Sequence, residues 1–260
     1  MPLSDSGEFH TPTLDDMFPP AILFEGTFFE FNRISLVRVV AMLLLVAFFL
    51  LTTRNMKLVP SRAQSLAEMS LDFVRVNIAE EILGKSSAKR WTPLLVVIFF
   101  TVLFMNITGV IPFLNIAGTS VVGYPLVLAV IAWIAFVYAG IRKHGAGHFF
   151  KEQLFPPGVP WPLYIILTPI ELISTFILRP VTLTIRLLAN MMAGHILLVL
   201  VFAATNFLLL DAAGALKGFS VLTFGAGIAF MALEIFIAAL QAYIFALLTA
   251  VYISLSEEGH

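Results

Sequence analysis

Residues 161–210 read WPLYIILTPIELISTFILRPVTLTIRLLANMMAGHILLVLVFAATNFLLL and form the longest apolar stretch of the chain. One membrane-spanning helix needs about 20 consecutive apolar residues, so this stretch is long enough for two helices. Pro180 removes a helical donor and disfavours helix in the residue before it. The sequence therefore predicts a hairpin with a first helix over 161–178 and a longer second helix over 181–210.

The composition of the whole chain is that of a membrane protein. Apolar types make up 60% of the 260 residues and charged types 12%, with a mean hydropathy of +0.98. A soluble domain is about half apolar and about a quarter charged, so a soluble globular enzyme is excluded. The absence of Cys excludes a disulfide scaffold and a thiolate metal site. We expect an all-α polytopic membrane protein with five to six membrane helices, including a long tilted C-terminal helical hairpin.

The uneven distribution of Lys and Arg predicts an orientation. Residues 1–33 form an acidic segment, with six carboxylates and no Lys or Arg up to residue 30. Basic residues follow the first membrane helix, predicted at 34–52, and flank residues 91–141, which hold the second and third membrane helices. Loops rich in Lys and Arg stay in the cytoplasm. We therefore expect the N-terminus outside. The loop before the last helix holds one Lys and the tail none, so the charge rule does not apply to the C-terminus, which we expect in the cytoplasm.

Two further segments complete the organisation. Residues 60–87 carry apolar side chains near helical spacing with charges between them, which predicts an amphipathic helix on the cytoplasmic membrane surface; an ordinary solvated helix fits the same pattern. Residues 161–255 hold the hairpin and the tilted helices. The last helix, predicted at 219–254, is longer than an upright span needs and indicates strong tilt. Five crossings with a partly inserted hairpin and six full crossings both fit this end of the chain.

Several polar side chains lie in predicted membrane helices. An Arg at the centre of such a helix costs about 2.5–3.5 kcal/mol on insertion scales, so it is retained when it is paired, faces water or serves function. A static ion pair between helices is the alternative interpretation. The ionisable residues are Glu171, Arg186, His195 and Glu234, and the polar amides are Asn106, Asn190 and Gln241.

The spacing of these residues predicts which of them share a helix face. Arg186 and Asn190 are four residues apart and share a face. Arg186 and His195 are nine apart, on opposite sides and roughly 13 Å apart along the axis. Glu234 and Gln241 share a face of the last helix. If the two helices are antiparallel, Glu234 could meet His195, a pair suited to proton relay, and Gln241 could lie near Arg186.

Small residues predict close helix packing next to these groups. Alanines continue from Glu234 at intervals of four, and such a stripe lets another helix approach closely. The members of the stripe are Ala238, Ala242, Ala246 and Ala250. We expect Ala189 and Ala193 to provide the facing groove.

Two motifs resemble a known family. Residues 182–195, TLTIRLLANMMAGH, resemble the signature of subunit a of the F-type rotary ATP synthase, and residues 240–252, LQAYIFALLTAVY, resemble its closing helix. The acidic N-terminal segment and the SEEGH ending resemble bacterial members, which implies a location in the bacterial inner membrane. The resemblance implies an ion-translocating stator that provides two proton half-channels against a rotating ring of c subunits, each with one carboxylate. It makes residues 161–255 the ion-translocating core.

The resemblance also implies partners and residue roles. The partners are c-ring subunits, peripheral stalk subunit b, other ATP synthase subunits and membrane lipid; no nucleic acid, cofactor or metal is implied, and ATP chemistry belongs to other subunits. Arg186 would face the ring, and His195 and Glu234 would line the half-channel open to the outside. The supporting residues would be Asn190 and Gln241 near the arginine, Glu171 near the cytoplasmic half-channel, and Asn106.

One feature of the motif leaves the order of proton transfer open. Many bacterial relatives carry the acid at the position of His195 and the histidine at that of Glu234, so either residue can come first. The choice between H+ and Na+ stays open too. The alternative function is a cation-coupled secondary transporter, but such proteins often have two related halves, and this chain shows no internal repeat. A structural scaffold is a third option, which predicts that neutralising Arg186 and Glu234 together leaves function intact.

Overall fold

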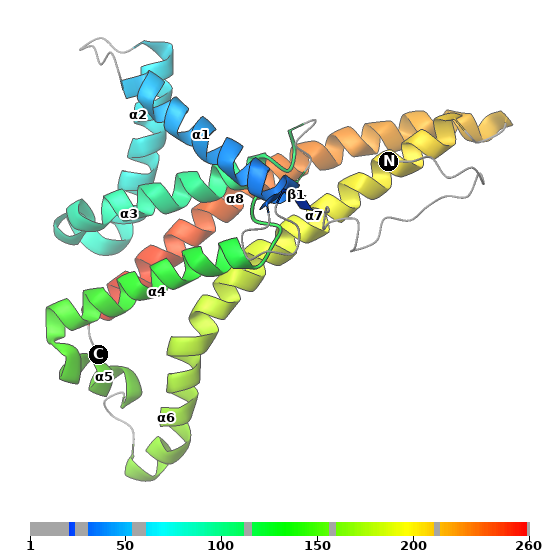
Figure 1. Ribbon diagram of the computed structural model, residues 1–260. Helices are drawn as coiled ribbons and strands as arrows, with labels where there is room; N and C mark the ends of the chain where they lie inside the picture. Colours follow the sequence, from blue (N-terminus) through cyan, green and yellow to red (C-terminus); the bar gives the residue numbers. More distant parts are fainter. Residues whose placement is uncertain are drawn as a thin grey trace.

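The computed structural model describes residues 21–23, 31–53, 61–111, 116–155, 160–210 and 214–258. Helices dominate this part of the chain (Figure 1), and two short strands, β1 (Ala21–Leu23) and β2 (Phe31–Asn32), form an antiparallel pair. Most of the predicted outer segment 1–33 falls outside the described residues. The helices are α1 (Arg33–Thr53), α2 (Arg62–Val74), α3 (Glu81–Ile107), α4 (Gly123–His144), α5 (Ala146–Leu154), α6 (Tyr164–Ile173), α7 (Arg179–Leu210) and α8 (Phe219–Glu258).

Five helical stretches of the described chain are long and apolar enough to cross a membrane. A helix forms its backbone hydrogen bonds within one segment, which is what a lipid environment requires. The protein is therefore an all-α multi-pass membrane protein. The sequence fitted either five or six membrane crossings, and the described part of the chain has five candidate crossings.

The centre of the bundle is formed by α3, α4 and α8, with α7 against α4 and α8, and α1 against α3 (Figure 1). The alanine stripe of α8 is completely buried, as its spacing predicts. Ala189 and Ala193 of α7 are exposed, so the expectation that they form the facing groove is wrong. The α7 helix instead buries Leu187 and Met191, because its larger apolar side chains face the bundle.

The predicted reversal of the chain at Pro180 is wrong. Helix continues through it: α6 leads into a π-helical segment, Ser174–Leu178, and then into α7. Proline removes one helical hydrogen bond and bends a helix, and a π-helical turn absorbs such a local mismatch without reversing the chain. The chain reverses between Leu210 and Phe219, so the C-terminal hairpin consists of α7 and α8.

The predicted surface helix and the second membrane helix meet at a bend. Ser61 caps α2, since its hydroxyl oxygen accepts a hydrogen bond from the backbone N–H of Gln64 at 3.3 Å. Gly84 lies in the left-handed region (φ +70°) and interrupts the helical backbone there. On α2, Leu66 and Met69 are 54% and 66% exposed. An apolar face of the helix is thus left uncovered by the rest of the chain.

The C-terminal end of α8 is joined to two other helices through Glu257. Its carboxylate accepts hydrogen bonds from the Ser87 hydroxyl at 2.6 Å and the Trp91 indole nitrogen at 2.9 Å, both on α3. The Nε2 atom of His144, at the end of α4, lies 3.1 Å from the Glu257 carbonyl oxygen. We call these contacts the Glu257 junction. They fix the end of α8 against α3 and α4.

Candidate functional site

The helices α7 and α8 carry most of the predicted site and run antiparallel, which is the condition under which the sequence places Glu234 near His195. Near their connection, the Thr205 hydroxyl donates a hydrogen bond to the Thr223 hydroxyl at 2.9 Å. Farther along, the Asn190 amide nitrogen donates to Oε1 of Gln241 at 3.1 Å. Partner numbers fall on α7 as they rise on α8, so the two helices face each other over much of their length. Asn190 and Gln241 are brought together one turn from Arg186.

Arg186 lies on the exposed face of α7. This face repeats at helical spacing and carries mostly small or apolar side chains; its other exposed members include Ile185, Ala189, Asn190, Ala193 and Leu197. Neither of the two ion pairs in the described part of the chain involves Arg186. A guanidinium stays protonated at any physiological pH. The chain thus presents a permanent positive charge on a membrane helix, available to a group outside the chain.

Glu234 lies against α7 at the residue next to His195. Its side chain is 4% exposed, and its Oε1 would be only 2.9 Å from a Cβ atom built on Gly194. Only glycine at this position leaves room for the carboxyl group as it stands. Its Oε2 is buried and has no hydrogen-bond partner among the described residues. Glu234 and the half-buried His195 therefore lie at the same level of the hairpin, as the sequence predicts for antiparallel helices.

Arg33, the first residue of α1, belongs to this region although the sequence analysis did not select it. Its guanidinium is close enough to the His195 ring to interact with it electrostatically. This electrostatic interaction joins residues far apart in the chain, so helical spacing could not find it. A basic residue at the end of the first membrane helix that the sequence predicts to lie outside, against the positive-inside rule, was the available signal.

Asn106 lies in a second polar cluster, at the end of α3. It is fully buried, and its Oδ1 accepts a hydrogen bond from the Thr119 hydroxyl at 2.6 Å. The neighbouring Gly118 carbonyl accepts a hydrogen bond from Nε of Arg38 at 2.9 Å. Both Nδ2 of Asn106 and Nη2 of Arg38 are buried without a partner in the described chain. Asn106 therefore belongs to a polar cluster that links the end of α3 and the α3–α4 connection to α1.

Glu171, on α6, is half-buried and lies before the bend that joins α6 to α7. It is 15 residues before Arg186, or about 22 Å along a straight helix. It interacts electrostatically with Arg179, whose guanidinium lies between the rings of Phe136 (4.9 Å) and Tyr252 (5.1 Å). From the sequence, Arg179 marks only the end of a predicted helix. Its position inside a continuous apolar run would have marked it as an intramembrane charge.

The chain is similar to proteins of one family over nearly all its length. The family model described as "ATP synthase A chain" matches residues 35–254. A protein of Rhodococcus erythropolis named "ATP synthase subunit a" is 52% identical over 249 residues, which cover 96% of this chain and 90% of that protein. Its counterpart in Pseudarthrobacter chlorophenolicus is 40% identical over 262 residues, covering 100% and 98%. In Hyphomonas neptunium the identity is 41% over 226 residues, covering 86% of each chain.

Proposed function

Because this chain belongs to the ATP synthase subunit a family, we propose that it is the ion-translocating stator of the membrane sector, with two proton half-channels and an essential arginine, Arg186. Family membership makes it a multi-pass membrane protein of ATP synthesis and ion transport, with other ATP synthase subunits as partners. It also favours the stator over the secondary transporter considered from the sequence. Within the proposal, the partners in contact are the carboxylate-bearing c subunits of the ring and peripheral stalk subunit b.

The exposure of Arg186 is the observation that carries the proposal. A charged side chain on a membrane helix is costly unless it is paired, and Arg186 has neither of the ion pairs of the described chain. Its face of α7 is otherwise small and apolar, which suits close approach by another helix. A ring carboxylate passing this face would supply the missing negative charge.

The guanidinium has two effects in this position. It cannot release its proton, so it blocks direct passage of protons between the half-channels. It also favours the ionised form of a carboxylate beside it, which promotes proton release on that side. A neutral carboxyl group enters lipid far more readily than a charged one. The ring would therefore turn in the direction that lets each carboxylate be reprotonated before it meets lipid.

The two half-channels are assigned to opposite ends of the site. Glu234 and His195 lie at one level of α7–α8, and Arg33 approaches His195 from α1. We assign this end to the half-channel open to the outside. Glu171 lies toward the opposite end and is assigned to the cytoplasmic half-channel. On a tilted helix, the roughly 13 Å between Arg186 and His195 becomes a sideways offset along the ring, which converts proton flow into rotation.

The same proposal fixes the orientation. Arg142, Lys143 and His144 end α4, so this end is placed in the cytoplasm, as is the amphipathic helix α2 with its exposed apolar residues. The C-terminal end of α8 shares that side, because the Glu257 junction connects it to the end of α4. The N-terminal segment lies outside, in a bacterial inner membrane. Asn106 belongs to the outer end of α3 in this orientation.

The test is Arg186→Lys in the complete ATP synthase, reconstituted in proteoliposomes. Lysine keeps a positive charge but can lose its proton when buried, so we expect proton-driven ATP synthesis to fall by at least about tenfold. The matched control is Arg62→Lys, an exposed arginine at the start of α2, which should leave the rate unchanged. Near-normal synthesis with Arg186→Lys would contradict the role of a permanent charge.

A further inference from the structure

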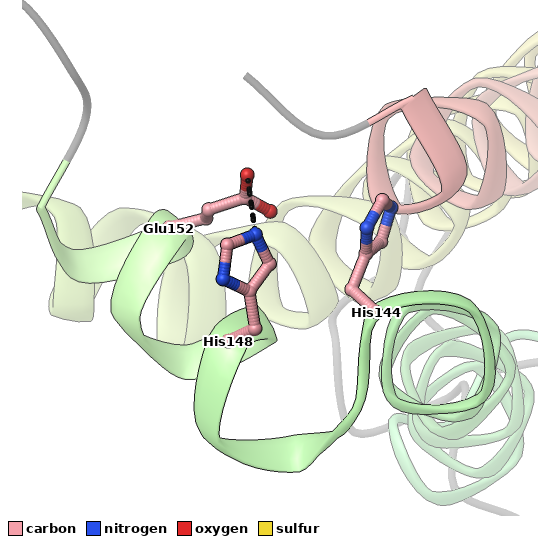
Figure 2. A group of neighbouring side chains, drawn as sticks. All are labelled: His144, His148 and Glu152. Atoms are coloured by element: carbon pink, nitrogen blue, oxygen red, sulfur yellow. Dashed lines mark ion pairs between the residues drawn. The ribbon is translucent and has the colours of Figure 1, made fainter.

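A separate group of titratable side chains lies where α4 meets α5. His144 is the last residue of α4, and His148 and Glu152 follow on α5 at intervals of four. Each offers one nitrogen or oxygen atom, and these atoms all lie within 4.8 Å of one another. Figure 2 shows the His148 ring between the Glu152 carboxylate and the His144 ring. We call these three residues the α4–α5 cluster.

The backbone brings the cluster together at a glycine. Gly145 has φ +82°, a conformation that other residues rarely adopt, and it redirects the chain from α4 into α5. The His144 ring consequently lies over the first turn of α5, with its centre 6.0 Å from that of His148. On α5 itself, Nε2 of His148 is 3.1 Å from Oε1 of Glu152. Three groups that can bind a cation thus share one face.

His144 is held in an orientation suited to binding a metal. Its Nε2 atom is 3.1 Å from the carbonyl oxygen of Glu257. A ring nitrogen that donates to a backbone carbonyl leaves the other nitrogen unprotonated, and metal-binding histidines are commonly held in this way. Glu257 is itself fixed by the hydrogen bonds from α3. One ligand of the cluster is therefore positioned in advance, while the His148 side chain is 59% exposed and accessible to an ion from water.

We propose that His144, His148 and Glu152 bind a divalent transition metal ion, with Zn2+ as the best chemical match. Two imidazoles and one carboxylate are a common ligand set for Zn2+, with water in the fourth position. Tetrahedral coordination at about 2.1 Å places ligand atoms roughly 3.4 Å apart. Nε2 of His148 and Oε1 of Glu152, which are 3.1 Å apart, are already close to this spacing. Rotation of the exposed His148 side chain closes the wider separation to His144.

This site differs from the expectation drawn from the sequence. The sequence was expected to hold no metal site, thiolate sites being excluded by the absence of Cys, and His144 was seen only as one of the basic residues that follow residue 141. The three residues do follow a regular interval of four, but the interval spans the end of one helix and the whole of another. Gly145 separates His144 from His148 and Glu152, so no single helix carries all three residues.

Binding can be measured by isothermal titration of ZnCl2 into the full-length chain, purified in detergent without a polyhistidine tag and washed with a chelator. We expect His148→Ala to lose one Zn2+ per chain, or to bind that ion at least tenfold more weakly. Glu152→Gln, which keeps the shape of the side chain, should weaken binding in the same direction. The control Lys151→Ala, an exposed neighbour on α5, should bind Zn2+ like the natural chain.

Two results would overturn the proposal: a natural chain that binds no Zn2+, or equal binding by the natural chain and both cluster variants. Circular dichroism of each variant checks its helical content. Co2+ provides a second measurement, because it absorbs visible light much more strongly in a tetrahedral site than in an octahedral one. The strong absorption should be present in the natural chain and lost in Glu152→Gln. Neither measurement involves proton transport, so both are independent of the proposed function.

Discussion

The arginines of the bundle and the arginine of the exposed α7 face differ in how their charge is satisfied. Arg38 is half-buried, donates a hydrogen bond to the Gly118 carbonyl at 2.9 Å, and lies 5.5 Å from the centre of the Tyr124 ring. Arg179 is likewise half-buried, between two aromatic rings. Arg186 is exposed and contributes to neither ion pair of the described chain. All three lie on long apolar helices.

The difference shows that a charge in a membrane helix does not by itself mark the functional residue. Arg38 and Arg179 contact groups of their own chain, so they can persist for structural reasons. Arg186 forms no ion pair with the described residues, and in the proposed function a group outside the chain compensates its charge. Exposure of the charge, rather than its presence, separates the two kinds of arginine.

The strongest test of this comparison exchanges the two kinds of arginine for the same neutral residue. With Arg186→Gln, we expect proton-driven ATP synthesis by the complete enzyme in proteoliposomes to fall by at least about 100-fold. The free energy of unfolding of the purified chain should change by less than about 0.5 kcal/mol, because the side chain is exposed. With Arg38→Gln, we expect a loss of about 1–3 kcal/mol in that free energy.

Thermal unfolding of the detergent-purified chains and ATP synthesis by the assembled enzyme are measured on the same preparations. The Arg38→Gln enzyme that assembles should retain most of the natural rate of ATP synthesis when the two are compared at equal amounts of complex. If Arg186→Gln destabilises the chain as much as Arg38→Gln does, the distinction between the two kinds of arginine fails.

A smaller effect is expected at Glu234, which is buried and has a carboxylate oxygen without a hydrogen-bond partner in the described chain. Glu234→Gln keeps the shape and removes the exchangeable proton. We expect ATP-driven proton pumping to fall about 10- to 100-fold with little change in unfolding, since a positioned proton-transfer group contributes on that scale. Quenching of a pH-sensitive dye in proteoliposomes measures pumping.

The exposed carboxylate Glu81 on α3 provides the control, and Glu81→Gln should pump normally. Equal pumping by Glu234→Gln and the natural enzyme would remove Glu234 from the proton path and leave it as a packing residue.

The smallest effect is expected at the glycines between α7 and α8. A Cβ at Gly194 would meet the Glu234 carboxyl at 2.9 Å, and one at Gly227 would meet the Phe202 ring at 3.0 Å. Gly194→Ala should lower pumping about threefold to tenfold, because it displaces a group whose position matters. Gly227→Ala should leave the rate within about twofold, since it shifts an apolar ring by a few tenths of an ångström.

Both variants also replace a helical glycine, which favours the helix by up to about 1 kcal/mol and offsets part of the crowding. Their melting temperatures are therefore expected to lie close together. A larger pumping defect in Gly227→Ala than in Gly194→Ala would show that helix packing, and not the carboxyl position, sets the rate.

Periodicity predicted those features that depend on one helix at a time. The buried alanine stripe of α8 follows from residue spacing alone, and so does the pairing of Glu234 with the level of His195 once the two helices are antiparallel. Pro180 misled because its effect depends on the preceding segment: the π-helical turn Ser174–Leu178 converts an expected reversal into a bend. The helix propensities of single residues do not predict a π-helical turn.

The contacts that escaped prediction join residues distant in sequence. Arg38 and Gly118 are 80 positions apart, and their hydrogen bond depends on how the α3–α4 connection folds back onto α1. The approach of Arg33 to His195 is of the same kind. Arg38 could nevertheless have been singled out by the rule that selected Arg186, because it too interrupts an apolar run.

The Glu257 junction has a mechanical consequence. In the proposed assembly, a rotor driven against α7 pushes the α7–α8 pair sideways with an equal and opposite force. The pair is fastened to α3 and α4 at the Glu257 end, whereas Figure 1 shows its other end projecting beyond them. The α7–α8 pair is therefore stiffest near Glu257 and bends most easily at the end farthest from it. In the proposed assembly, a force on the exposed face of α7 reaches α3 and α4 through the Glu257 junction.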